Sequence, residues 1–527
     1  MKKLSFLFLL SLSITTRAQE KPNIVIILAD DMGFSDIGAY GSEIPTPNID
    51  KLAAGGIKLT QFYNTARCCP SRASLLTGLH PHQTGVGHMA EELENPGSSD
   101  WNIEGYKGYL NNSCVTIAEV LKQSGYHTYM SGKWHVGMAT KDRWPLQRGF
   151  EKFIGILPGG SSHLKTFPLR GITYGNNEMV FDTPADYYDT DFYTQNAINF
   201  IKEQKDNKPF FLYLAHTAPH WPIQAKTADI NKFIGKYDIG WDSVRHERAR
   251  RQLAMGLIKK DWGLSKQEMR PWNELTAQQQ KDVSYRMAIY AAQVSCLDDN
   301  VGKLIKSLEQ NGKMKNTIIM FLSDNGAAAE PGPELGGKPM SEVNNPDFFW
   351  AVSYGKGWAN VSNTPFSKFK TTLYEGGMST PFIAFWPGVI KSQENKWNTT
   401  PHYLIDIMPT VLDLAGAKYP ATYNGNRIKP TEGISMKPLF IKGAGQTHDY
   451  MYWEHQNNCA IRHGKWKAVK RLNDKTWELY DIDADRTEQN NIAEQHPDIV
   501  KDLDAKWEGW AKAHNVLPKG EMKQVYK

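Results

Sequence analysis

The sequence of 527 residues contains few cysteines and has little net charge. Its five cysteines are Cys68, Cys69, Cys114, Cys296 and Cys459. Thiols this few and scattered exclude a disulfide framework as the main support of the fold. The formal net charge at pH 7 is +5, from 61 basic and 56 acidic residues. A chain this close to neutrality lacks the electrostatic footprint of a nucleic-acid-binding protein, so we expect no nucleic-acid partner.

Long hydrophobic runs are also missing, apart from one near the N-terminus. Lys2 and Lys3 precede the run LSFLFLLSLSI, and the small residue Ala18 suits a cleavage position after it. This is the pattern of a secretory signal peptide, whereas a membrane-spanning helix needs about 20 apolar residues. We therefore expect residues 1–18 to be removed and the protein to be exported, without membrane insertion. Removing three basic residues from the 61 leaves 58 against 56 acidic ones, a net charge of +2.

Four short apolar runs have the length of β-strands and end abruptly in polar residues. The polar residues that follow the runs are Asp30 and Asp31, Lys133 and His135, His216 and His220, and Asp324 and Asn325. Unbroken apolar runs are typical of strands that are covered on both faces. Helix-like segments lie between them, and this alternation predicts an α/β fold with a large, mixed, mostly parallel sheet between helices. Ligands bind at the carboxyl ends of such strands, so we expect the polar residues to meet at one edge.

The pattern changes after about residue 440. Three runs of alternating polarity are followed by the helix-like segment DIVKDLDAKWEGWAKAH. Alternation is typical of an antiparallel sheet with one face covered. We therefore predict a signal peptide at 1–18, a catalytic domain at 19–440, and a smaller C-terminal domain at 441–527 with an antiparallel sheet and a helix.

Oxygen-bearing side chains end two of the predicted strands. Asp30, Asp31, Asp324 and Asn325 offer carboxylate and amide oxygens, which hard divalent cations prefer. Each pair taken alone reads as an ordinary loop opening, because Asp, Asn and Gly favour turns. Their joint position at strand ends favours a metal site. Residue types alone leave calcium, magnesium and manganese as alternatives.

The segment CCPSRASLLTG, residues 68–78, resembles the signature of the type I sulfatases, Cys-x-Pro-Ser-Arg followed by a helix that ends in Thr-Gly. The resemblance continues, in the family's order, through NIVIILADDMG, GKWH, APHWP, LSDNG and KTTLYEGGMSTPFIAFWPG, and YGKGWANVSNTPFSKFK is most similar to the bacterial arylsulfatase subgroup. It implies the alkaline-phosphatase-like fold and a sulfuric ester hydrolase. Pro70 and Arg72 stand two and four positions after Cys68, so the spacing selects Cys68 over Cys69.

The resemblance implies that a separate maturation enzyme oxidises Cys68 to formylglycine, an aldehyde. One hydroxyl of the aldehyde hydrate attacks sulfur and gives a sulfoenzyme intermediate. The other hydroxyl then loses its proton and expels sulfate by C–O cleavage, which divides one difficult step into two. One metal ion per chain, usually Ca²⁺, favours the alkoxide and screens the sulfate charge.

The resemblance also assigns roles to individual residues. The expected metal ligands are Asp30, Asp31, the modified Cys68, Asp324 and Asn325. The expected catalytic residues are Cys68, Arg72 and Lys133 around the formylglycine, His135 as the base for sulfate expulsion, His220 as the acid for the leaving alcohol, and Lys370 on the sulfate. A histidine suits proton transfer because its ordinary pKa is about 6.5. His216 and Lys368 are near alternatives to His220 and Lys370.

The resemblance implies a sulfate ester as substrate, and a bacterial enzyme that is periplasmic or secreted more often meets sulfated glycans than aryl sulfates. Our hypothesis is removal of O-sulfate from a carbohydrate, with 3-O-sulfated galactose of mucin-type glycans as the candidate. His163, Lys165 or Arg170, in a glycine-rich segment, are candidates for reading sugar hydroxyls. The alternatives are a phosphonate or phosphodiester hydrolase of the same superfamily and a non-catalytic sulfated-glycan binder.

Overall fold

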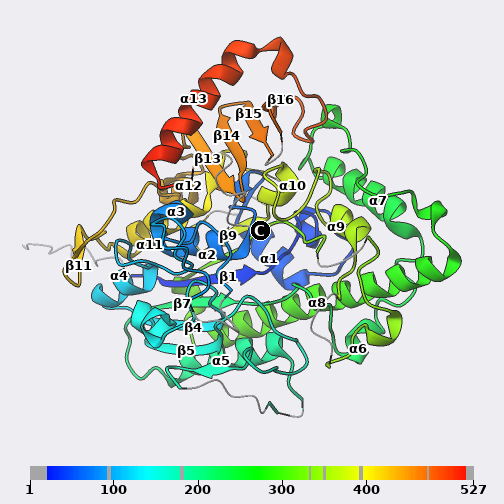
Figure 1. The fold of residues 1–527 in the computed structure, drawn as a ribbon. Helices are drawn as coiled ribbons and strands as arrows, with labels where there is room; N and C mark the ends of the chain where they lie inside the picture. The colour runs from blue at the N-terminus through cyan, green and yellow to red at the C-terminus, as the bar shows by residue number, and fades with distance from the viewer. Residues whose placement is uncertain are drawn as a thin grey trace, which may run out of the picture.

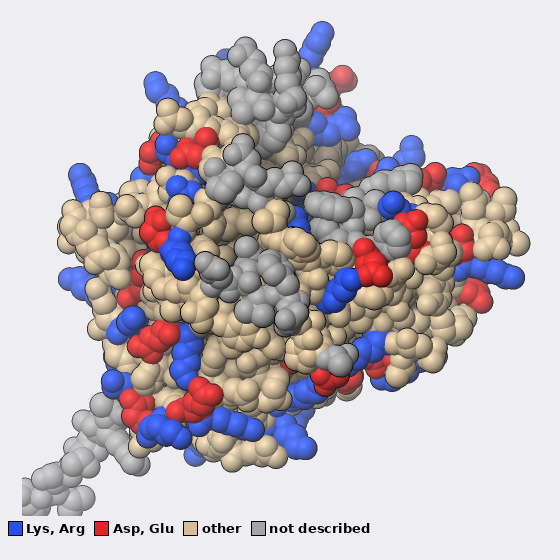
Figure 2. Space-filling view, turned by 60° about the horizontal axis from the view of Figure 1, so that its bottom comes forward, with Lys and Arg blue, Asp and Glu red and all other residues tan. Residues whose placement is uncertain are grey.

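The computed structural model describes residues 21–91, 97–177, 183–184, 186–330, 334–347, 352–390, 396–471 and 474–517. The predicted signal peptide at 1–18 lies outside these residues. Within the described ranges, no helix has the length and hydrophobicity that crossing a membrane requires. Basic and acidic side chains are interspersed over the face of the molecule shown in Figure 2.

An eight-stranded sheet forms the centre of the molecule (Figure 1). Its strands are, in spatial order, β2 (Ile57–Leu59), β9 (Phe382–Phe385), β8 (Thr317–Ser323), β1 (Asn23–Ala29), β7 (Phe210–Ala215), β4 (His127–Lys133), β5 (Lys152–Ile156) and β6 (Thr173–Tyr174). The strands from β8 to β5 are parallel, while β9 and β6 run antiparallel to their inner neighbours. This confirms the predicted large, mostly parallel sheet.

Helices cover both faces of the sheet. Successive side chains of a strand point to opposite faces, so each strand contributes to the core on both sides. In β1, Ile24 and Ile26 belong to the core on one face, while Val25 and Ile27 belong to the core on the other. The first face is covered by α2 (Cys68–Thr77), α4 (Ile117–Gln123), α11 (Ile407–Ala415) and α12 (Lys437–Lys442). The second is covered by α1 (Pro47–Gly55), α5 (Asp189–Glu203), α6 (Thr227–Ile230), α7 (Gly240–Ala254), α8 (Ala277–Gln310) and α9 (Lys356–Ser362). Burial on both faces explains the unbroken apolar runs in the sequence.

A smaller antiparallel sheet and a helix follow at the C-terminal end, shown at the top of Figure 1. The sheet contains β13 (Tyr450–His455), β14 (Asn458–His463), β15 (Trp466–Lys470) and β16 (Glu478–Asp481), and the helix is α13 (Pro497–Ala513). Trp507 and Trp510 of α13 pack on one face of this sheet. Val469 and Trp453 of its other face belong to the main core. The predicted C-terminal sheet and helix are confirmed, whereas the boundary at residue 440 stays a prediction.

Buried ion pairs join this sheet to the main body. Lys467 Nζ of β15 lies 2.9 Å from Glu375 Oε1 of α10 (Glu375–Met378) and 2.7 Å from Glu488 Oε1. Arg486 Nε lies 2.8 Å from Glu375 Oε2. None of these side chains is more than 2% exposed, so their charges have to be compensated inside the protein, chiefly by one another.

Candidate active site

Residues that follow four parallel strands meet at one edge of the main sheet. Asp31 follows β1, and its backbone N–H donates to Asp324 Oδ1, beyond β8, at 3.3 Å. Asn325 Nδ2 donates to Asp31 Oδ1 at 2.7 Å. Asp31 has a φ of 63°, a left-handed conformation that Asp tolerates better than most residues and that ends the strand at the site. The structure thus brings together the predicted acidic strand ends.

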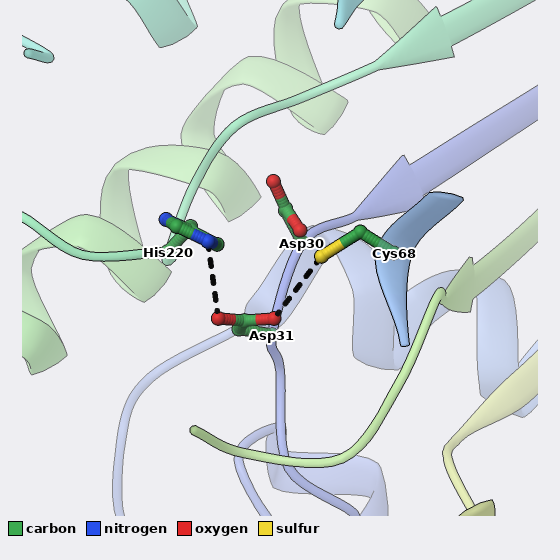
Figure 3. A group of neighbouring side chains, drawn as sticks. All are labelled: Asp30, Asp31, Cys68 and His220. Atoms are coloured by element: carbon green, nitrogen blue, oxygen red, sulfur yellow. Dashed lines mark hydrogen bonds and ion pairs between the residues drawn. The ribbon is translucent and has the colours of Figure 1, made fainter. Parts of the chain in front are cut away.

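Cys68 is the first residue of α2, whose residues are all buried. Its Sγ lies 3.9 Å from Asp31 Oδ1 (Figure 3). Arg72 stands one turn further and therefore on the same helix face. The helix ends at Gly78, which has a φ of 71° and whose Cβ would lie 2.7 Å from Met408 Cβ. Only glycine fits this left-handed, crowded position, which explains the Thr-Gly at the end of the motif.

Three buried cations surround the acidic residues. Arg72 Nε donates to Asp324 Oδ2 at 3.0 Å. Lys133 Nζ lies 2.6 Å from Asp30 Oδ2, and Lys370 Nζ lies 2.7 Å from Asp31 Oδ1. Burial lowers the pKa of each lysine, but Asp30 beside Lys133 and Asp31 beside Lys370 more than offset it and leave both pKa values raised. Both lysines are therefore charged at neutral pH.

The acidic side chains fit a divalent cation. Among the described residues, the buried Asp30 Oδ1 and Asn325 Oδ1 atoms have no hydrogen-bond partner. Burial and the neighbouring Asp30 raise the pKa of Asp324, a cost that a bound cation would offset. Asp30, Asp31, Cys68 and His220 each place one possible ligand atom within 4.8 Å of the others (Figure 3). An oxygen-rich donor set with orphaned oxygens suits a hard ion.

His220 faces the same centre. Its Nε2 lies 3.5 Å from Asp31 Oδ2, and burial lowers its pKa to about 4. His163 lies behind it, with Nδ1 at 2.9 Å from Asp189 and Nε2 at 2.9 Å from the His220 carbonyl oxygen. Both ring nitrogens of His163 are thus used inside the protein. The expectation that His163 reads sugar hydroxyls is therefore wrong, because it is buried and holds the His220 backbone instead.

Within the described part of the chain, the alternatives to two of the predicted residues, His216 and Lys368, make no hydrogen bond or ion pair with the acidic residues of the site. His216 is buried, and among the described residues neither of its ring nitrogens has a hydrogen-bond partner. Lys368 Nζ lies 2.8 Å from Glu268 Oε1, whereas Lys370 reaches Asp31. Lys370, rather than Lys368, is therefore the lysine that joins the cluster.

His135 lies beside the second cysteine. Its Nε2 is 3.1 Å from Cys69 Sγ and 3.2 Å from Glu91 Oε1. Burial, helped by Lys133, lowers the pKa of His135 to about 3, so the ring is neutral and able to accept a proton. Burial raises the pKa of Glu91, but the contact with His135 outweighs it and brings the pKa to about 2.

Sequence reasoning missed the partly exposed groups at this site. The Glu91 and Glu330 side chains are 35% and 39% exposed, in contrast to the buried centre. Arg67 Nη1 lies 2.7 Å from Glu330 Oε1, which is 3.7 Å from Lys370 Nζ. Arg67 directly precedes Cys68, a signal that could have identified it. Glu91 and Glu330 lie in irregular segments without a periodic pattern.

The other two loop candidates differ from each other. Arg170 Nη2 lies 3.5 Å from Glu91 Oε2, so it joins the contacts next to His135. Lys165 pairs with Asp347, and both side chains are exposed. Arg170 therefore remains close to the predicted centre, while Lys165 is engaged in a surface ion pair.

A mostly parallel sheet with a cysteine-headed helix, an acidic cluster and three cations at its carboxyl edge defines a hydrolase of anionic esters. The family model described as Sulfatase matches residues 22–417, and the model for the C-terminal part of N-sulphoglucosamine sulphohydrolase matches residues 366–512. The chain belongs to the sulfatase family, specifically to the type I sulfatases of the alkaline-phosphatase-like superfamily. It is thus an enzyme that hydrolyses sulfate esters.

Several known proteins are similar to this chain along most of its length. An uncharacterized sulfatase of Schizosaccharomyces pombe is 35% identical over 522 residues, which cover 93% of each chain. The arylsulfatase of Klebsiella aerogenes is 35% identical over 436 residues, 80% of this chain and 92% of that one. The crystal structure of Ps i-CgsB in complex with k-i-k-neocarrahexaose is 27% identical and covers 96% of both chains, with a TM-score of 0.69. Membership of the family implies a formylglycine and a metal ion.

Proposed function

We propose that this sulfatase removes O-sulfate from a carbohydrate, with formylglycine at position 68 and one Ca²⁺ ion per chain. The candidate substrate is 3-O-sulfated galactose of mucin-type glycans. The observation that carries the proposal is the position of Cys68, whose Sγ lies 3.9 Å from Asp31 at the start of a fully buried helix. Arg72, Lys133 and Lys370 supply positive charge around it, as an anionic sulfate requires.

The acidic residues hold the metal ion in this proposal. Asp30, Asp31, Asp324 and Asn325 are its protein ligands, together with the modified side chain at position 68. The ion would supply screening of the sulfate charge. Asp30 Oδ1 and Asn325 Oδ1 accept no hydrogen bond from the described residues, which supports this assignment, because buried acceptors without hydrogen bonds are costly.

The formylglycine hydrate would supply one hydroxyl that attacks sulfur and a second hydroxyl whose deprotonation expels the sulfate by cleavage of the other C–O bond. Arg72 and Lys133 hold that side chain in place from the helix face and from the end of β4. Lys370, whose Nζ lies 2.7 Å from Asp31 Oδ1, supplies positive charge for the sulfate. Fixed charges in a buried site interact strongly, because little water screens them and little reorganisation is needed.

His220 donates a proton to the oxygen of the leaving alcohol. Its Nε2 faces the centre, and the bond from His163 Nε2 to the His220 carbonyl fixes the segment that carries it. Burial keeps the free ring neutral, and an anionic sulfate beside it favours the protonated form. Proton transfer of this kind accelerates reactions by about 10²–10⁴-fold.

His135 accepts the proton whose removal releases sulfate. Its low pKa keeps the ring neutral before the reaction. Cys69 and Glu91 contact the same nitrogen, Nε2, and hold the ring beside the nucleophile helix. After proton transfer, Glu91 compensates the new positive charge at 3.2 Å.

A carbohydrate substrate is supported by two observations. The similar protein Ps i-CgsB was solved with k-i-k-neocarrahexaose. In the present chain, the partly exposed carboxylates of Glu91 and Glu330 offer acceptors for sugar hydroxyls. We further propose export with removal of residues 1–18, a domain boundary near residue 440, and action of a maturation enzyme on Cys68.

The proposal is tested on protein produced with a sulfatase-maturation enzyme. Peptide mass spectrometry first establishes formylglycine at position 68. Sulfate release is then measured on galactose 3-, 4- and 6-sulfate, on 6-sulfated N-acetylhexosamines, on 4-nitrophenyl sulfate and on a matched phosphodiester.

The matched variants are Cys68→Ala, which removes the nucleophile, and Cys69→Ala, which leaves it. We expect release from galactose 3-sulfate that is lost in Cys68→Ala and retained in part in Cys69→Ala. Faster turnover of the phosphodiester would contradict the sulfatase assignment. Release from other sugars but from no galactose sulfate would remove the galactose candidate alone.

A further inference from the structure

A second group of metal-ligating side chains shares no residue with the active site. It consists of His80, Glu432 and His514, which lie between α2 and α3 (Pro81–Thr84), between β12 (Asn426–Arg427) and α12, and directly after α13. One ligand atom of each residue lies within 4.8 Å of the others. No short spacing motif links residues so far apart in the chain. The fold therefore creates this group, which we call the His80–Glu432–His514 cluster.

The hydrogen bonds of His514 determine which ring nitrogen carries a hydrogen. His514 Nδ1 lies 2.7 Å from the backbone oxygen of Trp510, and a carbonyl oxygen only accepts, so Nδ1 is the donor. His514 Nε2 lies 2.8 Å from Glu432 Oε1. In a neutral ring this nitrogen has only a lone pair, and a carboxylate oxygen has no hydrogen to give. A proton or a metal ion must therefore lie between the two atoms.

His80 completes the cluster from the other side of the carboxylate. Its Nε2 lies 3.7 Å from Glu432 Oε2, which is too long for a hydrogen bond. His80 is buried, and the neutral form of an imidazole is the one that binds metal. Gln83 Nε2 donates to Glu432 Oε1 at 2.6 Å and holds the carboxylate between the two rings.

We propose that His80, Glu432 and His514 bind a zinc ion. Imidazole and carboxylate ligands lie about 2.0–2.2 Å from zinc, so two ligands of a tetrahedral ion are about 3.4 Å apart. The two ligand separations, 2.8 and 3.7 Å, lie on either side of that value. The bond from His514 Nδ1 to the Trp510 carbonyl is the outer contact that orients zinc-bound histidines.

The surroundings allow an ion to enter. The Glu432 side chain is 35% exposed, while those of His80 and His514 are 5% and 12% exposed. Three protein ligands leave a fourth position for water on the exposed side. Two imidazole nitrogens favour zinc over calcium or magnesium, whereas the oxygen donors of the active site favour a hard ion. Zinc at the cluster would join the end of α13 to the segment that follows the nucleophile helix.

The experiment uses the full chain, stripped of metal and then saturated with Ca²⁺ so that the active site is filled. Zinc chloride is titrated by calorimetry, and bound zinc is counted by elemental analysis after dialysis. The variants are Glu432→Gln and His514→Gln. The matched control is His246→Gln, because His246 Nδ1 makes the same contact to a backbone oxygen, that of Asp242, at 2.7 Å. Thermal melts without zinc check that every variant folds.

We expect the wild-type and His246→Gln chains to bind one zinc ion more than either cluster variant. Where a cluster variant still binds zinc at this site, its affinity should be lower by at least about tenfold. Zinc should also raise the unfolding midpoint of the wild type and not that of Glu432→Gln. X-ray absorption of the zinc-loaded wild type should show two nitrogen ligands at about 2.0–2.1 Å. Equal zinc binding in all four proteins, or a shell of oxygens alone, would overturn the proposal.

Discussion

Two lysines, Lys465 directly before β15 and Lys467 within it, give a direct test of how the C-terminal sheet is held. Lys467 is fully buried between Glu375 and Glu488, at 2.9 and 2.7 Å. Lys465 also has a carboxylate partner, Asp481, at 2.7 Å, but its side chain is 47% exposed. Each lysine is replaced by methionine, which keeps the apolar stem and removes the charge. The two variants differ mainly in the burial of the pair that is broken.

The expected costs differ several-fold. Breaking a buried ion pair leaves an uncompensated charge and costs about 3–5 kcal/mol, whereas an exposed pair contributes about 0–1 kcal/mol. Arg486 still compensates Glu375 in the Lys467→Met variant, so Glu488 is the charge left without a cation. We therefore expect a loss of about 4 kcal/mol for Lys467→Met and less than about 1 kcal/mol for Lys465→Met. Adding Glu488→Gln to Lys467→Met should recover part of the loss.

The cost of Lys467→Met should depend on pH. Burial raises the pKa of Glu488 even with Lys467 present, and removing Lys467 raises it further. Between the unfolded pKa and this raised value the folded state binds more protons than the unfolded state, so stability falls as pH rises. The destabilisation should be smaller at pH 5 than at pH 8.

The assay is denaturant unfolding followed by tryptophan fluorescence, to which Trp507 and Trp510 on the C-terminal sheet contribute. Equal losses in the two lysine variants, or a loss for Lys467→Met that is the same at pH 5 and pH 8, would refute the reasoning. The first result would mean that burial does not decide the strength of these pairs.

Three further predictions concern the active site. Lys370→Met should lower kcat/KM for sulfate esters by about 10²–10³-fold, because Lys370 contacts Asp31. Lys368 pairs with Glu268 instead, so the activity of Lys368→Met should stay close to that of the wild type. Similar losses in both variants would show that the contact with Asp31 is unimportant. His220→Asn should slow release from a sulfated sugar by about 10²–10⁴-fold and affect 4-nitrophenyl sulfate less, since nitrophenolate leaves without a proton; equal slowing of both substrates would argue against proton donation. Chelation should abolish activity and Ca²⁺ should restore it, with Asp324→Asn needing more Ca²⁺; activity that survives exhaustive chelation would exclude the proposed metal role.

The sequence predicted the fold well because its signals are local. Unbroken apolar runs such as 24–29 identify buried parallel strands, and parallel strands put their carboxyl ends at one edge. The convergence of Asp31 and Asn325 follows from that topology and from nothing more specific. Cys68 was selected over Cys69 by spacing within one helix, which is also a local property.

Other features depend on contacts between distant segments and could not be predicted. Lys467 lies in a strand of alternating polarity, which indicates a sheet with one solvent-exposed face. In the structure both faces of this sheet are covered, one by α13 and the other by the main core. The sequence therefore does not reveal that Lys467 is buried, or that it pairs with the buried Glu375. His163 was expected to read sugar hydroxyls from a polar, glycine-rich loop. Composition did not reveal that this loop folds inward behind His220.

The burial of Cys68 has a consequence for the order of events during synthesis. The side chain is 1% exposed and heads a helix with no exposed residue, so a second enzyme cannot reach its sulfur once the chain has folded. Asp324 and Lys370, whose charges act on this buried thiol, are synthesised long after it. The proposed oxidation of Cys68 is therefore expected to precede the completion of the main sheet. A cell that folded this chain faster than it modified it would accumulate a protein with an unmodified, buried thiol.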